Sequence, residues 1–343
     1  MNKEMVTDDH RAKRPVAGVL IIVGGLILLA LGFILSIAVG AVDIRFSTVI
    51  EAIFQFHPDV TQHQIIRELR LPRSTAAVLV GAALAVSGAI MQGMTRNPLA
   101  DPGILGINAG AGFMLAICFA FFPGLSFNYI ILFSFAGAAI STVLVYTLGS
   151  AGKGGMSPVR LAIVGAAISA LLIALSDGIA LYFQIAQDLA FWSAGGIAGT
   201  KWSQVHILLP WIIAGLIGAM MLSRYITVLS LGEDVARGLG QRTGTIKLLG
   251  SILVLILAGA SVSVVGAVGF VGLIIPHIVR SLVGVDYRWI IPCSAILGGL
   301  LMVLADIGGR MINPPYETPI GALIALIGVP FFLYLARKGG KGL

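Results

Sequence analysis

Long apolar stretches without charge recur along the whole chain, separated by short segments that carry charges, prolines or glycine clusters. A bilayer core is crossed by about 20 consecutive apolar residues in a helix. The pattern therefore predicts an all-α, polytopic membrane protein with about ten spanning helices. They are expected near residues 16–40, 74–95, 104–122, 128–149, 161–183, 205–223, 248–267, 270–284, 289–306 and 319–336.

Two uncharged runs are too long for one span each. The run 102–152 must hold two spans, and the sequence FPGLSFN at 122–128 indicates the turn between them. The run 248–279 contains Gly266, Gly269 and Gly272, which favour a full span followed by a short one. No segment has the composition of a soluble domain, so we expect one transmembrane domain over residues 1–343.

Composition agrees with this pattern. Hydrophobic residues make up 58% of the chain and charged residues 11%, against about 25% charged in soluble domains. Cys118 and Cys293 both lie within apolar runs, where small buried hydrophobic residues are expected rather than a metal site or a disulfide. The net charge of +7 is explained by basic residues in the cytoplasmic loops of a membrane protein. We therefore expect a lipid bilayer as the environment and no nucleic-acid partner.

The distribution of lysine and arginine predicts the orientation. With the N-terminus inside, 16 of the 22 basic residues fall on the cytoplasmic side and 6 outside. Both termini, including a tail over residues 1–15, are then cytoplasmic, in a cell (inner) membrane. Three of the outer charges, Arg67, Arg70 and Arg73, lie within nine residues. They are either docking residues or anchors to lipid headgroups.

The longest inner loop is expected over residues 224–247. It contains a short helical pattern at 231–239, with Glu233 and Asp234 at its start and Gly238 and Gly240 at its end, as at helix boundaries. A capped helix on a cytoplasmic loop offers a rigid contact to a partner; the alternative is a plain solvated loop.

Recognised catalytic and nucleotide-binding patterns do not occur in the sequence. It has no G-x-x-x-x-G-K-[ST], no H-E-x-x-H and no G-x-S-x-G, so we expect no enzyme and no catalytic residue. Ionisable residues within spans are functional candidates because burying a charge in a membrane costs about 3 kcal/mol or more. Here they are Asp177, His277 and Asp306.

Each of these three residues also has a structural interpretation. Asp177 fits a water-filled cavity or a helix interruption, and His277 fits a bond to a carbonyl freed by Pro276. Asp306 fits an i,i+4 pair with Arg310. A proton-coupled secondary transporter that uses Asp177 and His277 is the alternative function at this point.

Several motifs in order resemble the FecCD family of import permeases for iron-siderophores, haem and vitamin B12. They are LRLPR at 69–73, LVGAALAVSGAIMQGMTRNPLADPGILGINAGA at 79–111, LGEDVARGLG at 231–240, GFVGLIIPHIVRSLVG at 269–284 and PYETPIGALIALIGVPFFLYL at 315–335. The resemblance covers nearly the whole chain from about residue 40. It implies the FecCD-type permease fold, and a coupling loop discriminates such an importer from a secondary transporter.

The resemblance also implies partners and roles. Arg70, Arg73 and Arg310 would dock an extracellular solute-binding protein. The coupling loop would contact separate ATP-binding subunits, which bind ATP and Mg²⁺ while this chain binds no cofactor and no metal. A second permease, identical or related, would complete the pore, and a ferric siderophore is the favoured substrate. The cytoplasmic gate would lie near Ser157 and Pro158. The matching coupling-loop positions are Leu231, Gly232, Glu233, Asp234, Ala236, Gly238 and Gly240.

Overall fold

The computed structural model describes residues 15–40, 44–151, 158–313 and 316–339, and within them all regular structure is helical. Seven helical segments are long and apolar enough to cross a membrane, and three shorter apolar helices accompany them, in the part of the chain that is described. Each of the ten predicted spans falls on one of these segments, which confirms the predicted fold class.

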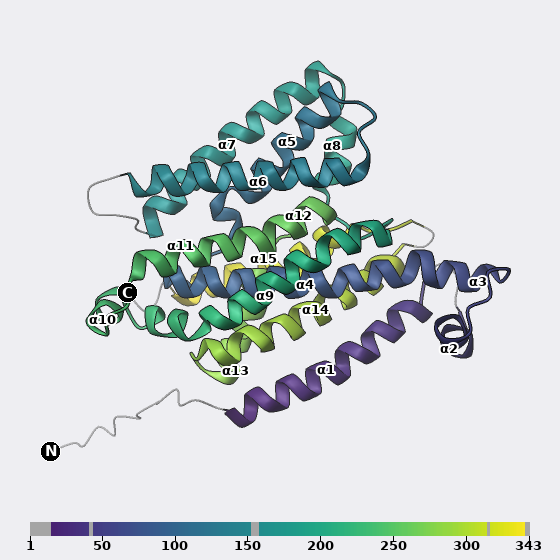
Figure 1. Cartoon of the computed structure of the whole chain (residues 1–343), viewed down its shortest axis with the longest axis horizontal. Helices are drawn as coiled ribbons and strands as arrows, with labels where there is room; N and C mark the ends of the chain where they lie inside the picture. The colour runs from purple at the N-terminus through teal and green to yellow at the C-terminus, as the bar shows by residue number, and fades with distance from the viewer. Residues whose placement is uncertain (1–14, 41–43, 152–157, 314–315, 340–343) are drawn as a thin grey trace.

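The elements follow one another in a simple order (Figure 1). They are α1 (Pro15–Ala38), α2 (Phe46–Phe54), α3 (Thr61–Gln64), the π-helical turn η1 (Ile65–Arg70), α4 (Leu71–Thr95), the 3₁₀ turn η2 (Pro102–Leu105), α5 (Ile107–Phe121), α6 (Phe127–Ser150), α7 (Pro158–Tyr182), α8 (Ala186–Ser193), α9 (Trp202–Ser230), α10 (Glu233–Gly238), α11 (Thr243–Val254), the π-helical turn η3 (Leu255–Gly259), α12 (Ala260–Val265), α13 (Val271–Val283), α14 (Tyr287–Met311) and α15 (Ile320–Gly339).

Both predicted breaks are present. The chain turns between α5 and α6 at residues 122–126, and the glycine-rich run after α12 separates it from α13. Gly266 and Phe270 both adopt positive φ in that second break. The predicted loop 224–247 is shorter than expected, because α9 continues past Arg224 to Ser230 and α11 begins at Thr243.

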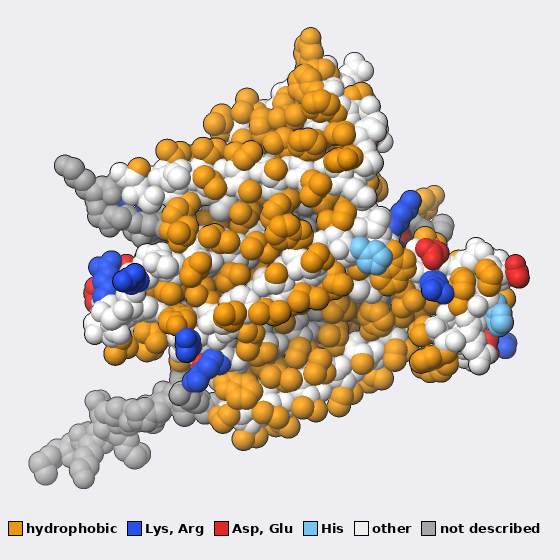
Figure 2. Space-filling model, in the orientation of Figure 1, with side chains coloured by type: hydrophobic (Ala, Val, Ile, Leu, Met, Phe, Trp, Pro, Cys, Tyr) orange, Lys and Arg blue, Asp and Glu red, His pale blue; other side chains and the backbone are white. Residues whose placement is uncertain are grey.

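The surface matches a protein embedded in a bilayer. On the face that Figure 2 shows, hydrophobic side chains cover the middle of the molecule and charged side chains gather at its two ends. Figure 1 places the start of α1 at the same end as α10, opposite α2 and α3. With the excess of basic residues inside, that shared end is the cytoplasmic one. The chain is a multi-pass membrane protein.

Helix α4 lies at the centre, packed against α14, α9, α13 and α11. Glycines permit the closest of these contacts. A Cβ on Gly81 would collide with the backbone carbonyl of Gly298 in α14, and a Cβ on Gly88 would collide with that of Gly272 in α13. Small residues at such crossings let helix backbones approach in membranes, where packing takes over from the hydrophobic effect.

Candidate functional site

A buried carboxylate organises the outer end of the molecule. Asp306, on the last turns of α14, is fully buried and accepts hydrogen bonds from two arginines. Its Oδ1 lies 2.8 Å from Nε of Arg73 in α4, and its Oδ2 lies 2.8 Å from Nη2 of Arg310. The expected i,i+4 pair between Asp306 and Arg310 is thus confirmed, and the carboxylate additionally joins α14 to α4.

A second carboxylate reaches the same cluster from the segment before α15. Arg73 Nη1 lies 2.6 Å from Oε1 of Glu317, whose side chain is 42% exposed, whereas the Arg73 side chain is 12% exposed. Arg73 therefore bridges a buried acid and a solvent-facing one. Glu317 was not singled out from the sequence, because nothing in its local pattern places it beside residue 73.

The other two arginines bind backbone. Arg70 Nη1 donates to the carbonyls of Ile37 and Ala38, the latter at 2.9 Å. Arg310 Nη1 donates to the carbonyls of Ser36 and Val39, both at 2.9 Å. The last carbonyls of a helix lack intrahelical donors, and cationic side chains there also complement the helix dipole. These arginines therefore cap α1 and hold it against α4 and α14.

These two arginines are largely covered. Arg70 and Arg310 are only 7% and 8% exposed, because the end of α1 lies over them. Their part in docking stays a prediction. The Arg73 side chain is 12% exposed and pairs with the more exposed Glu317, whereas Arg67 is exposed and its Cζ lies 4.5 Å from the centre of the Phe56 ring.

The inner end carries the short helix that the sequence predicted. Helix α10 begins at Glu233, whose carboxylate lies 2.6 Å from both Arg237 Nη2 and Lys247 Nζ and also accepts from Thr243. The hydrogen bond from Lys247 is the main reason that the pKa of Glu233 is lowered from its ordinary value. Glu233 thereby ties α10 to the first two turns of α11.

One side of this loop helix is apolar and open. Val235 within α10 and Leu231 and Leu239 on either side of it are 49%, 60% and 70% exposed. Ala236, by contrast, is fully buried within the chain. A Cβ on Gly238 would meet no atom.

Two of the remaining loop positions are glycines whose backbone conformation bounds α10. Gly232 and Gly240 flank the helix at φ of +136° and +78°, which only glycine adopts easily. Asp234, in the first turn, is exposed. Helix α10 is thus an exposed helix on the inner side, and Ala236 packs against the rest of the chain rather than facing solvent.

The residues of the alternative transport mechanism are far apart in the fold. Asp177 is exposed on α7, which packs against α5 and α6. His277 lies on α13 against the Phe331 ring of α15, with 5.7 Å between ring centres. Figure 1 shows α7 and α13 on opposite sides of the molecule. Of the predicted gate, Ser157 lies outside the described residues, and Pro158 begins α7 without a described side chain.

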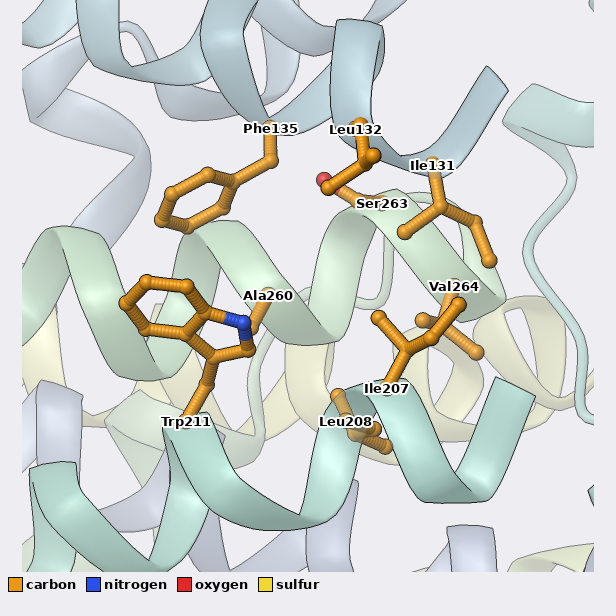
Figure 3. Close-up of a pocket in the computed structure, with 9 residues that line it drawn as sticks. All are labelled: Ile131, Leu132, Phe135, Ile207, Leu208, Trp211, Ala260, Ser263 and Val264. Atoms are coloured by element: carbon orange, nitrogen blue, oxygen red, sulfur yellow. The ribbon is translucent and has the colours of Figure 1, made fainter. Parts of the chain in front are cut away.

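A crevice between α6, α9 and α12 is lined almost wholly by apolar groups, among them Phe135 and Trp211, which face one another (Figure 3). Its free space of about 30 Å³ holds no more than about two water-sized groups. It is too small for a metal chelate.

Cys118 and Cys293 are buried and unpaired, as expected. Among the described residues, no cluster of three His, Cys, Asp or Glu side chains could hold a metal.

Comparison with known proteins gives consistent relatives. The chain is 56% identical to the iron(3+)-hydroxamate import system permease protein FhuB of Bacillus subtilis, over 96% of this chain and 86% of that protein. It is 45% identical to the iron-uptake system permease protein FeuB of the same organism (91% and 94%) and 40% identical to the ferric enterobactin transport system permease protein FepD of Escherichia coli (93% and 95%).

A solved structure agrees with the helical arrangement. An inward-facing conformation of a putative metal-chelate type ABC transporter matches with a TM-score of 0.82 and 29% identity, over 93% of this chain and 99% of that one. The model of the FecCD transport family matches residues 28–338. The chain therefore belongs to the FecCD transport family.

Proposed function

We propose that this chain is the membrane-spanning permease subunit of an ABC importer that moves ferric siderophores into the cell. The observation that carries the proposal is the inner loop helix α10, which presents an apolar face to the cytoplasm on a rigid, ion-paired base. The names of the relatives support the transport class, and the family match over residues 28–338 covers most of this chain.

Helix α10 is the proposed contact with an ATP-binding subunit. The exposed side chains of Leu231, Val235 and Leu239 would insert into an apolar groove of that subunit. The ion pairs of Glu233 would pass its movement to α11. ATP and Mg²⁺ are held by the partner in this scheme, and this chain performs no hydrolysis.

Two copies of the permease, or this chain and a related one, would form the pore. Helices α7 and α8 support this proposal, because they leave Leu181, Tyr182 and Phe191 75–85% exposed near the outer end. An extracellular binding protein would deliver the chelate to that end. Its docking would rely on accessible charge, for which Arg67 and the Arg73–Glu317 edge are better placed than the buried Arg70 and Arg310.

The proposed substrate is a ferric hydroxamate, because the relative at 56% identity is named for hydroxamate import and the relatives named for other chelates are less similar. Uptake of ⁵⁵Fe by the complete transporter tests this. A trihydroxamate chelate should show a lower half-saturating concentration than ferric citrate or a ferric catecholate. A preference for either of the others would overturn the assignment.

The contact with the ATPase is tested by Leu239→Asp, which places a charge on the exposed face of α10. The variant should lose ATPase from the purified complex and lose uptake. The same substitution at Leu69, an exposed residue at the outer end, is the matched control. Retention of the ATPase by Leu239→Asp at the stoichiometry of the control would contradict the proposed interface.

A further inference from the structure

Pro276 interrupts the hydrogen bonds of α13. Proline has no N–H, so the carbonyl of Gly272, four residues earlier, loses its helical donor, and the proline ring crowds that carbonyl. Water is not available to bond such a group inside a bilayer, and neighbouring helices commonly supply the missing donor. The carbonyl of Gly272 is therefore expected to have a partner outside α13.

That partner is Gln92 of α4. Its Nε2 donates to the Gly272 carbonyl at 3.1 Å and lies 3.4 Å from that of Leu273. Gln92 is 2% exposed, and it follows Gly88 by one helical turn on the same face of α4. Because Gly88 has no side chain, α4 approaches α13 closely enough for the Gln92 amide to reach the freed carbonyl.

The oxygen of the same amide holds the other half of α13. Gln92 Oε1 accepts a hydrogen bond of 2.8 Å from Nη2 of Arg280, which lies one turn beyond Pro276. A single side chain thus bonds α13 on both sides of its proline. An amide can do this because it is both donor and acceptor, whereas a carboxylate or an apolar side chain cannot.

From Arg280 the contacts continue to the base of α10. Arg280 Nη2 lies 3.5 Å from the Tyr287 hydroxyl, and the backbone N–H of Tyr287 donates to Thr227 Oγ1 at 2.9 Å. Thr227 is in the last turn of α9, which leads directly into α10. A connected set of polar contacts therefore runs from the base of α10 to the Gly272 carbonyl that Pro276 leaves without a helical donor.

We propose that Gln92 is a positioning residue for transport: its amide replaces the N–H that Pro276 lacks, fixes the two halves of α13, and releases them when α10 moves so that α13 bends at Pro276. The bonding part of this inference stands on the contacts alone. The bending part rests on the proposed function, because it assigns the movement to a transport cycle.

A double-mutant cycle on the purified permease tests the bonding part. Pro276→Ala restores the N–H, so Gln92→Leu should lower the ratio of folded to unfolded protein about ten-fold more with Pro276 than with alanine there. Gln92→Leu removes the hydrogen bond to Arg280 whether residue 276 is proline or alanine, so this loss cancels when the two effects are compared. If Gln92→Leu does not fold, Gln92→Asn, whose amide is one methylene shorter, replaces it.

The matched control is Pro330→Ala, which removes the proline inside α15 instead. Gln92→Leu and Pro330→Ala should act additively. Equal effects of Gln92→Leu with proline and with alanine at 276 would overturn the proposed bond.

Uptake kinetics test the bending part. Pro276→Ala should lower the maximal uptake rate several-fold and leave the half-saturating concentration within about two-fold, because the conformational step rather than substrate binding is impaired. If the double-mutant cycle shows coupling between Gln92 and Pro276 but Pro276→Ala keeps the wild-type maximal uptake rate, the bending part is overturned and the bonding part stands. Wild-type protein without ATP-dependent uptake would instead refute the proposed function, and the stability cycle would still report on the bond.

Discussion

Replacing Asp306 by asparagine tests whether the outer arginines are structural. The substitution keeps the size of the side chain and removes the charge that pairs with Arg73 and Arg310, each at 2.8 Å. Removing one partner of a buried ion pair leaves an uncompensated charge and costs about 3–5 kcal/mol. Asp306 is fully buried, and its loss removes the carboxylate that pairs with Arg310 while Arg73 keeps Glu317, so we expect a cost within that range.

Glu317→Gln provides the comparison, since it removes the other carboxylate bound to Arg73. The Glu317 side chain is 42% exposed, and exposed pairs contribute about 0–1 kcal/mol. The two substitutions should therefore differ by at least about 2 kcal/mol in the free energy of unfolding.

Unfolding of the purified permease in mixed micelles, followed by circular dichroism, measures both variants. Asp306→Asn should unfold at clearly lower denaturant than Glu317→Gln. Similar midpoints for the two variants would refute the view that Asp306 is the centre of the buried ion pairs and hydrogen bonds that join α1, α4 and α14.

Three further predictions concern other parts of the fold. Gly81→Ala should destabilise the permease by about 1–3 kcal/mol, because the added methyl collides with the Gly298 carbonyl, whereas Gly24→Ala, with no atom near its Cβ, should not; equal melting temperatures would contradict the close crossing. The lowered pKa of Glu233 means that its contribution to stability is present above its unfolded pKa, near 4.5, and is lost as pH falls through the folded value. The hydrogen-exchange protection factors of α10, which are corrected for the intrinsic pH dependence of amide exchange, should therefore fall at acidic pH in the wild type and stay constant over that window in Glu233→Gln; the same fall in both would assign it to another group. Ala236→Arg should destabilise the permease itself, because Ala236 is fully buried, whereas Gly238→Ala should leave its stability unchanged; a normal melting temperature for Ala236→Arg would show that this face of α10 is not packed.

The sequence predicted the spans well because membrane helices are specified by local composition. Length and lack of charge locate each segment without knowledge of its neighbours. The break before α13 was predictable from Gly266, whereas the positive φ of Phe270 was not, since that residue type does not favour it. The short helices α2, α3 and α8 were missed because they lie in connecting segments without a long apolar run.

The candidate sites were harder to predict because they depend on contacts between distant segments. Charge and position placed Arg70 and Arg310 at the outer end correctly, but their burial depends on the end of α1, which lies more than 30 residues from Arg70. Gln92 carries no signal in an apolar stretch, and only the freed carbonyl of Gly272 gives it a role. By contrast, Asp306 and Arg310 were paired correctly because their spacing of four residues is a local property.

Uptake into proteoliposomes that contain the permease, its ATP-binding subunits and its binding protein tests the central claim most directly. With ⁵⁵Fe-hydroxamate as substrate, accumulation should require ATP on the side that α10 faces and should continue when an uncoupler collapses the proton gradient. Accumulation that proceeds without the ATP-binding subunits and stops with the uncoupler would contradict the assignment as an ABC import permease.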